Sequence, residues 1–245
     1  MSTIFSKSDE RTKRSNAKQV GAPRRGKAAA PAKTKARGDG PGSAPREVSI
    51  IGGQWKRTKL PVADRPGLRP TPSRVRETLF NWLVHLGGGD MNGWRCLDAY
   101  AGTGALGFES ASRGAAEVVL LERDPQLLKT LRSIQEKLKA DMVKSETADA
   151  LAWMARSAPN RFDVVFLDPP FDADDLVVPS LKAARRLLAN EGLVYLEGPR
   201  ACNPEAIAAL GLAVLRQGRA GAVHFHLLNS IDPVEPAPVD PVSSS

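Results

Sequence analysis

The chain has 245 residues, of which 42% are hydrophobic and 25% are charged, and its formal net charge is +8. No run approaches the roughly 18 apolar residues of a membrane span, and no apolar signal core follows Met1, so we expect a cytoplasmic protein without a membrane partner. His85, His224 and His226 form no metal-ligand spacing with the two cysteines, so no metal site is expected.

The two ends of the chain differ in composition from its middle. Residues 1–46 are dominated by Ala, Gly, Pro, Ser, Lys and Arg and contain no Leu or Trp, and residues 231–245 carry four prolines. Segments this poor in apolar residues cannot offset the entropy of ordering. We therefore expect a disordered basic arm over 1–46, one folded domain over 47–230 and a disordered tail over 231–245.

Positive charge is concentrated on the N-terminal side. Residues 1–47 hold 12 Lys and Arg against 4 Asp and Glu, a net +8, and residues 48–86 hold 7 against 2, a net +5. A basic approach to the rest of the domain indicates a polyanionic partner that is reached from this side. A solubilising arm is an equally open interpretation of the first 46 residues.

The folded part begins with a hairpin and a helix, over 47–90. Residues 48–51 and 54–62 predict two short strands joined by a glycine turn. Thr71 is expected to cap a helix that has Pro72 at its first position. The apolar face of this helix consists of Val75, Leu79, Trp82, Leu83 and Leu86.

Strands and helices then alternate over 91–230. Strands are predicted at 94–100, 118–122, 143–147, 163–168 and 192–197, and helices at 104–113, 125–140, 149–157 and 174–189. Residues 212–215 and 222–228 predict a closing antiparallel hairpin. This order predicts an α/β fold with a doubly wound, mostly parallel seven-stranded sheet.

The first of these core strands runs into a glycine-rich loop, Gly102-Thr103-Gly104-Ala105-Leu106-Gly107. The loop matches the dinucleotide pattern G-x-G-x-x-G, which fits any adenosine-containing cofactor. Asp98, just before the loop, would repel a pyrophosphate and would suit the cationic amino-acid part of S-adenosylmethionine. Glu122 ends the next strand, where a carboxylate can accept hydrogen bonds from both ribose hydroxyls.

Asp149 follows the third core strand, where its carboxylate can accept from the adenine amine, cap the next helix, or do both. The expected cofactor pocket comprises Thr71, Asp98, Tyr100, Gly102, Gly104, Glu122, Asp149 and Ala150.

The fourth core strand ends in Asp168-Pro169-Pro170-Phe171. Two prolines cannot extend the sheet ladder, so the strand must stop and open into a cleft. A planar exocyclic amine becomes a nucleophile when two acceptors hold its hydrogens, and Asp168 and the Pro169 carbonyl are suitable acceptors. Phe171 could stack on a base taken out of its helix. A plain turn after a core strand is the alternative, and the glycine-rich loop with Asp98 favours a methyltransferase.

With these residues in view, the chain resembles the RsmD-type family, bacterial 16S rRNA guanine-N2 methyltransferases. The resemblance runs from about residue 48 to 228, and its most specific stretch is Gly67-Leu68-Arg69-Pro70-Thr71-Pro72-Ser73-Arg74-Val75-Arg76-Glu77-Thr78-Leu79-Phe80-Asn81-Trp82-Leu83. Supporting stretches are Ile51-Gly52-Gly53-Gln54-Trp55 and Gly102-Thr103-Gly104-Ala105-Leu106-Gly107-Phe108-Glu109.

The resemblance implies a Rossmann-like class I methyltransferase that takes its methyl group from S-adenosylmethionine. It implies as substrate the N2 amine of one guanine in 16S rRNA, free or in the assembling small subunit, and we expect a monomer. The catalytic loop corresponds to Asp168, Pro169, Pro170 and Phe171. The expected RNA-binding residues are Trp55, Lys56, Arg57, Arg69, Arg74 and Arg76.

Departures from the family and alternative functions remain. Tyr100 stands where the family usually has Phe, and Arg216-Gln217-Gly218 stands where it often has Arg-Glu-Lys. Trp55 can stack on a base or pack on the domain. The same loop chemistry serves methylation of adenine N6 in DNA or RNA and of a glutamine amide. A non-catalytic RNA-binding protein is disfavoured because both loops are intact.

Overall fold

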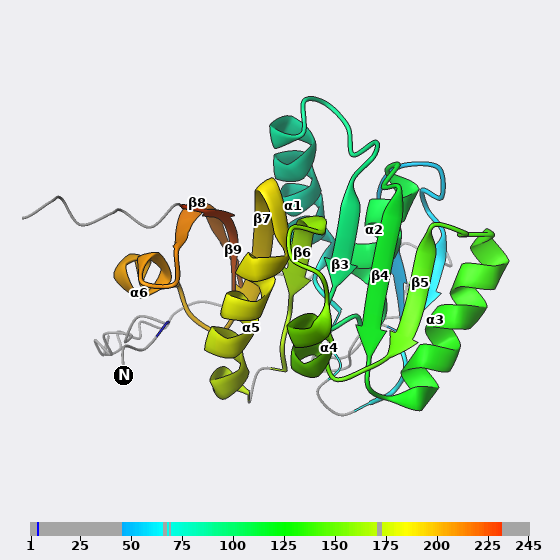
Figure 1. Cartoon of the computed structure of the whole chain (residues 1–245). Helices are drawn as coiled ribbons and strands as arrows, with labels where there is room; N and C mark the ends of the chain where they lie inside the picture. The colour runs from blue at the N-terminus through cyan, green and yellow to red at the C-terminus, as the bar shows by residue number, and fades with distance from the viewer. Residues whose placement is uncertain (1–3, 5–45, 66–67, 69, 171–172, 232–245) are drawn as a thin grey trace, which may run out of the picture. The chain divides into compact units, whose positions relative to one another are not determined.

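The computed structural model describes residues 4, 46–65, 68, 70–170 and 173–231 (Figure 1). The N-terminal extension consists of strands β1 (Glu47–Ser49) and β2 (Lys59–Pro61) and helix α1 (Ser73–Leu86). The helices of the core are α2 (Ala105–Ser112), α3 (Pro125–Leu138), α4 (Ala150–Arg156), α5 (Asp174–Leu187) and α6 (Pro204–Ala208). Its strands are β3 (Arg95–Asp98), β4 (Glu117–Glu122), β5 (Val143–Thr147), β6 (Phe162–Leu167), β7 (Leu188–Gly198), β8 (Leu212–Ala220) and β9 (Val223–Ser230).

The core strands form one seven-stranded sheet in the order β5-β4-β3-β6-β7-β9-β8. The first five strands in this order are parallel, and β9 runs antiparallel to both of its neighbours. The strand order reverses between β3 and β6, and in open α/β sheets ligands bind beyond the carboxyl ends of the strands at such a switch point. The predicted doubly wound sheet with an antiparallel C-terminal hairpin is confirmed.

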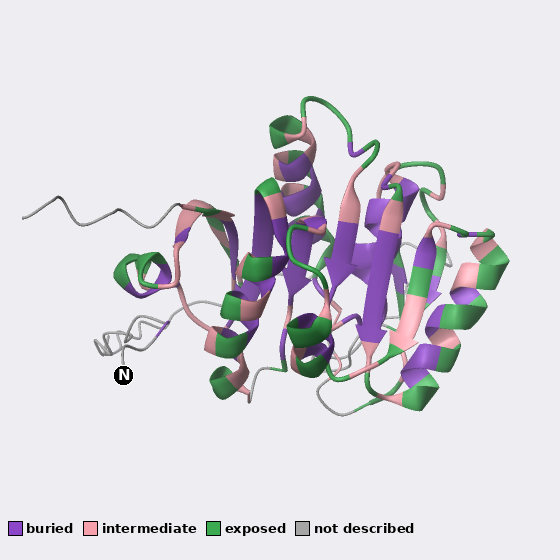
Figure 2. Cartoon of the chain, in the orientation of Figure 1, coloured by how far each residue is buried: buried purple, intermediate pink, exposed green. Residues whose placement is uncertain are grey.

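Helices cover both faces of the sheet and give the domain two apolar clusters. One cluster joins α1, α2 and α3 to side chains such as Cys96 and Val118, and the other joins α4, α5 and α6 to their neighbours Leu97 and Val119. Neighbouring residues of a strand point to opposite faces, so a strand buried on both faces must be apolar throughout. Figure 2 shows this burial along the central strands.

Two parts of the extension differ from prediction. Of the strand expected over 54–62, only Lys59–Pro61 is a strand, because the preceding residues form turns that pack on α2. Gly53 adopts φ +73, and a Cβ there would lie 1.8 Å from the carbonyl oxygen of Ser112, so the turn needs glycine. Thr71 does not cap α1, which begins at Ser73 without a side-chain cap, so that prediction is wrong.

Two further differences lie outside the extension. Helix α6 was not predicted, and β8 and β9 are longer than expected, so that the turn between them is short. Ile4 belongs to the segment expected to be too polar to join a core, yet it is buried in the α4–α5–α6 cluster and its carbonyl accepts from Asn203.

Both cysteines, Cys96 in β3 and Cys202, are free and buried. Cys202 precedes α6, and its backbone N–H donates to His226 Nε2 at 3.1 Å. No helix within the described ranges is both long and apolar enough to cross a membrane.

Candidate active site

A cavity of about 630 Å³ opens at the carboxyl ends of β3, β4 and β6, at the switch point of the sheet. This volume lies within the range of small-molecule sites. All eight predicted cofactor residues except Gly104 line it, together with Asp168, Pro169 and Pro170. The fold thus brings residues from five separate segments of the chain to one cavity.

Asp98 is the last residue of β3 and is 3% exposed. Its Oδ2 accepts a hydrogen bond from the backbone N–H of Gly107 at 3.1 Å. Burial raises the pKa of Asp98 to about 7, an effect that this hydrogen bond opposes and that Glu122 reinforces. A cation entering the cavity would favour the charged carboxylate, so Asp98 suits a positively charged group.

The glycine-rich loop connects β3 to α2 and packs closely against neighbouring side chains. Gly104 is the residue before α2 and has φ +72. A Cβ at Gly104 would lie 2.7 Å from Leu131 and 2.8 Å from Phe108, so the loop tolerates only glycine there. Gly104 thus packs against the helices on the side of the loop away from the cavity lining, whereas Gly102 lines the cavity.

Glu122 is held by two backbone groups. Its Oε2 accepts from the N–H of Gly102 at 3.0 Å, and its Oε1 accepts from the N–H of Asp124 at 2.8 Å. Each carboxylate oxygen has a second lone pair, so Glu122 can still accept from a ligand in the cavity. Its position at the end of β4 thus agrees with the predicted contact to a pair of hydroxyls.

Asp149 and Tyr100 are also constrained by the protein. Asp149 caps α4, with its Oδ1 accepting from the N–H of Ala152 at 2.8 Å, and it still lines the cavity. The Tyr100 hydroxyl lies 2.7 Å from Ser180 Oγ on α5. Burial raises the pKa of Tyr100, so it stays neutral.

Asp168 follows β6 directly and keeps part of its surface open to the cavity. Burial raises the pKa of Asp168 well above its usual range, and the charges of Glu197 and Asp98 raise it further. The carbonyl of Pro170 accepts from the N–H of Ala173 at 2.9 Å. Phe171 lies outside the described residues.

The predicted RNA-binding residues differ in their burial. Lys56, Arg57 and Arg74 are exposed, and Arg69 lies outside the described residues. Trp55 is partly buried against the α1–α2–α3 cluster, which is the packing alternative, and its backbone N–H donates to Ser112 Oγ at 2.9 Å.

Arg76 contradicts its predicted place on an RNA-binding surface. Its side chain is completely buried and donates to the carbonyl oxygens of Thr71 and Ser49 at 3.2 and 2.9 Å. It also lies 3.8 Å from the buried carboxylate of Glu109. Arg76 therefore joins the N-terminal hairpin to α1 and α2.

Sequence reasoning missed three polar residues at the site. Arg65 and Arg123 line the cavity mouth, and Arg65 lies 3.5 Å from Asp124. Glu197, near the end of β7, is 3% exposed and accepts hydrogen bonds from the side chains of Tyr195 and Thr71. The sequence could have indicated Glu197 as a site residue, because it lies at the carboxyl end of a predicted core strand.

Within the described ranges, no group of three or more His, Cys, Asp or Glu side chains is arranged to hold a metal ion.

Comparison with known proteins extends this description. The family described as Conserved hypothetical protein 95 matches residues 48–229. The chain is 43% identical over 156 residues to Ribosomal RNA small subunit methyltransferase D of Escherichia coli K12, an alignment that covers 62% of this chain and 74% of the relative. It is 37% identical over 189 residues to the protein of the same name from Haemophilus influenzae, covering 74% and 93%.

Solved structures show the same fold. The Escherichia coli protein yhhF superposes with a TM-score of 0.63 at 33% identity, covering 76% of this chain and 98% of that one. A Haemophilus influenzae protein described as a methylase superposes with a TM-score of 0.60 at 32% identity, covering 76% and 99%.

S-adenosylmethionine is the methyl donor of this family, and the cavity residues fit it. Asp98 offers a buried carboxylate to a cation, and Glu122 and Asp149 offer acceptors to hydroxyl and amine groups. The family match covers most of the chain, and the sheet, the cavity and the glycine-rich loop agree with it. The chain therefore belongs to the family described as Conserved hypothetical protein 95, that of the RsmD-type methyltransferases.

Proposed function

We propose that this protein methylates the exocyclic N2 amine of one guanine in bacterial 16S rRNA, acting as a monomer in the cytoplasm. The observation that carries the proposal is the position of Asp168 and Pro169 on the wall of the cavity that Asp98 and Glu122 also line. The choice of rRNA is supported by relatives that are named small-subunit rRNA methyltransferases and by the specific resemblance over residues 67–83.

The cofactor, when bound, supplies a methyl group carried on a positively charged sulfur. Asp98 would bind its amino-acid part through opposite charge, and Glu122 would accept from the ribose hydroxyls. Asp149 would accept from the adenine amine while it caps α4. The cavity walls would be completed by Thr71, Tyr100, Gly102 and Ala150, which line it.

Asp168 and Pro169 would activate the target amine. The lone pair of an aromatic amine is delocalised into the ring, and two acceptors that hold its hydrogens favour a pyramidal, reactive nitrogen. The amine must also lose a proton, and the raised pKa of Asp168 makes its carboxylate a better proton acceptor than an ordinary Asp. Phe171, next in sequence, is proposed to stack on the flipped base.

RNA would approach from the side of the extension. Lys56, Arg57 and Arg74 are exposed there, and Arg65 and Arg123 line the cavity mouth. Such side chains contact phosphates without reading sequence, so they would place the RNA rather than choose the base.

Methyl transfer from radiolabelled S-adenosylmethionine tests the proposal. The purified protein is incubated separately with naked 16S rRNA, assembled small subunits, duplex DNA and a glutamine-containing protein. Nuclease digestion and chromatography then identify the labelled product, with Asp168→Asn as the inactive control. Label in N2-methylguanosine is expected. Label in N6-methyladenine or in glutamine would replace the proposed substrate, and no label in any acceptor would contradict the activity.

A further inference from the structure

Glu197 of β7 lies one register step beyond the last residue pair of β6 and β7, at the level where Asp168 follows β6. The β6–β7 register pairs Phe166 with Tyr195 and Leu167 with Leu196, so Asp168 and Glu197 occupy the next level. Neighbouring strands are about 4.8 Å apart, and side chains at one level point to the same face. Both acids therefore project to the face that Phe166 and Tyr195 also cover, the face of α1 and α2.

The Glu197 carboxylate is fixed by donors on two sides. The Tyr195 hydroxyl donates to its Oε1 at 2.8 Å, and the Thr71 hydroxyl donates from the approach to α1. Burial raises the pKa of Glu197, and the hydrogen bonds from Tyr195 and Thr71 together with the buried guanidinium of Arg76 oppose that rise. These three contacts orient Glu197 and offset part of the cost that burial imposes on its negative charge.

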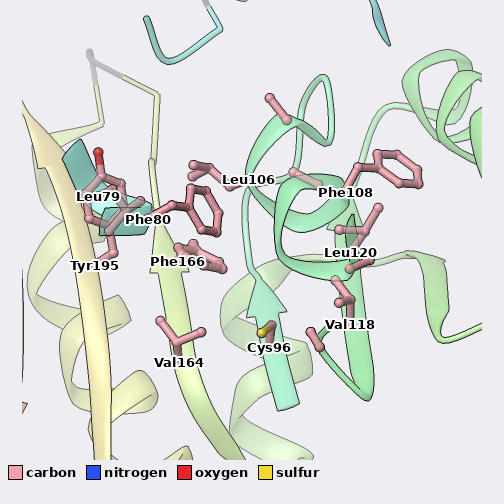
Figure 3. Packing of buried hydrophobic residues seen from close by; sticks show 14 of the residues in the cluster. Leu79, Phe80, Cys96, Leu106, Phe108, Val118, Leu120, Val164, Phe166 and Tyr195 are labelled. Carbon is pink, nitrogen blue, oxygen red and sulfur yellow. The ribbon is translucent and has the colours of Figure 1, made fainter. Parts of the chain in front are cut away.

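Buried aromatic side chains pack on the same face of the sheet as the two acids. Tyr195 meets Phe166 edge-on with ring centroids 6.2 Å apart, and Phe80 lies at the same distance from Phe166 (Figure 3). All three rings are completely buried. Carboxylates next to such buried rings interact strongly with one another, because little water screens their charges.

The other elements around Glu197 add few charges. On β3, Asp98 contributes a second carboxylate that acts on Asp168. On β9, Phe225 pairs with Glu197, while His224 and His226 belong to the adjacent levels and so to the opposite face. From α5, Asp174 lines a small cavity with Glu197 and forms an ion pair with Arg200 at 3.0 Å.

We propose that Glu197 is a positioning residue for methyl transfer, which orients Asp168 and supplies the neighbouring charge that makes Asp168 an effective proton acceptor. The inference rests on the proposed function, since it requires Asp168 to act on the target amine. In the transfer, the amine nitrogen gains the methyl carbon and loses one proton. That proton passes to a carboxylate oxygen of Asp168 and leaves its electron pair on the nitrogen, while the electron pair of the broken methyl–sulfur bond stays with the donor.

The pH profile of kcat/KM distinguishes the effect of the charge of Glu197 from the effect of its packing. Glu197→Gln keeps the shape and the acceptor for Tyr195 but removes the charge, so the acid limb should move down by about one to two pH units. The plateau kcat should fall about tenfold, because a weaker base remains. Glu197→Asp keeps the charge and should leave the acid limb close to that of the wild type.

Glu205→Gln, on the exposed surface of α6, is the matched control and should change neither quantity. An unmoved acid limb in a folded Glu197→Gln protein would overturn the proposal.

A second measurement needs no variant and no methyl acceptor. Carbon-13 NMR of the carboxyl carbons in the wild-type protein should show Asp168 and Glu197 titrating in two shared steps, as interacting acids do. Independent single-step titration of Asp168 would overturn the inference, even if Glu197→Gln failed to fold. Failure of the proposed function would appear instead as absent methyl transfer together with an intact coupled titration.

Discussion

The guanidinium of Arg76 lies 3.8 Å from the carboxylate of Glu109, and both side chains are completely buried. Glu109 also accepts from the backbone N–H groups of Ile51 and Gly52 at 2.6 and 2.8 Å, and from Arg113 Nε at 2.7 Å. One carboxylate on α2 therefore holds the N-terminal hairpin, α1 and the end of its own helix together.

Glu109→Ala should lower the free energy of unfolding by about 3–5 kcal/mol, because it removes the ion-pair partner of buried Arg76 and the acceptor of two partly buried N–H groups. Urea denaturation measures this loss. Glu136→Ala, at an exposed position of α3, is the control and should stay within about 0.5 kcal/mol of the wild type. A similarly small effect at Glu109 would show that the extension is held by its apolar contacts alone.

Asp168→Ala should reduce methyl transfer by about 10²-fold or more, as expected when a transition-state contact is removed. Affinity for S-adenosylmethionine should stay close to that of the wild type, because the proposed partner of Asp168 is the amine. Single-turnover kinetics and calorimetry separate the two effects. Wild-type turnover in this variant would remove Asp168 from the mechanism.

Glu122→Ala should weaken the binding of S-adenosylmethionine by about 1.5–3 kcal/mol through the loss of a charged acceptor. Isothermal titration calorimetry gives this difference directly. Glu122→Gln, which keeps an acceptor for the N–H of Gly102, should lose less than the alanine variant. Equal affinity in all three proteins would exclude a ligand contact at Glu122.

Asp98 should make the stability of the protein depend on pH. Its pKa is about 7 in the folded protein and about 3.9 in an unfolded chain, so folding favours the protonated form. The stabilisation is fully present below about pH 3.9 and is lost as pH rises through about 7.

Asp98→Asn should remove this dependence. The stability of the variant relative to the wild type should grow by up to about 1.4 kcal/mol per pH unit between about pH 5 and 7, and then level off. Urea denaturation at four pH values measures the slope. Asp141→Asn, at an exposed loop position, should give a flat difference, and a flat difference for Asp98→Asn would contradict the raised pKa.

Reversing the charge of Lys56 and Arg57 should weaken RNA binding and flatten its salt dependence. Each lost phosphate contact should remove roughly 0.7–0.9 from the slope of log K against log salt. Filter binding at several salt concentrations measures the slope. Lys137→Glu, in the last turn of α3, is the exposed control. An unchanged slope would place the RNA on another surface.

The alternation of strands and helices could be predicted because apolar strands such as β4 and β6 are followed by helix patterns. Helix α3 begins at Pro125, where it was predicted, since Asp124 caps it and the proline fixes its first turn. The strand predicted over 54–62 was wrong because its basic residues are exposed in turns that hydrogen bond to α2. Helix α6 has five residues, too few for a clear period.

Site residues could be predicted where one sequence segment contains both the strand end and the functional side chain, as at Asp168. Glu197 was missed because its meaning depends on which strand lies beside β7. The burial of Arg76 depends on acceptors that come from β1 and α2, far away in the sequence. Sequence patterns show such a residue only as a cation at the flank of an amphipathic helix.

Cys96 and Cys202 can serve as two internal reporters of how the structure opens. Burial raises the pKa of both thiols, that of Cys202 to about 12, so neither sulfur is in its reactive thiolate form while the structure is closed. A thiol reagent can therefore modify each cysteine only when its surroundings open. Cys96 lies in the middle of the sheet and would record global unfolding, whereas Cys202 beside α6 would record a smaller local opening.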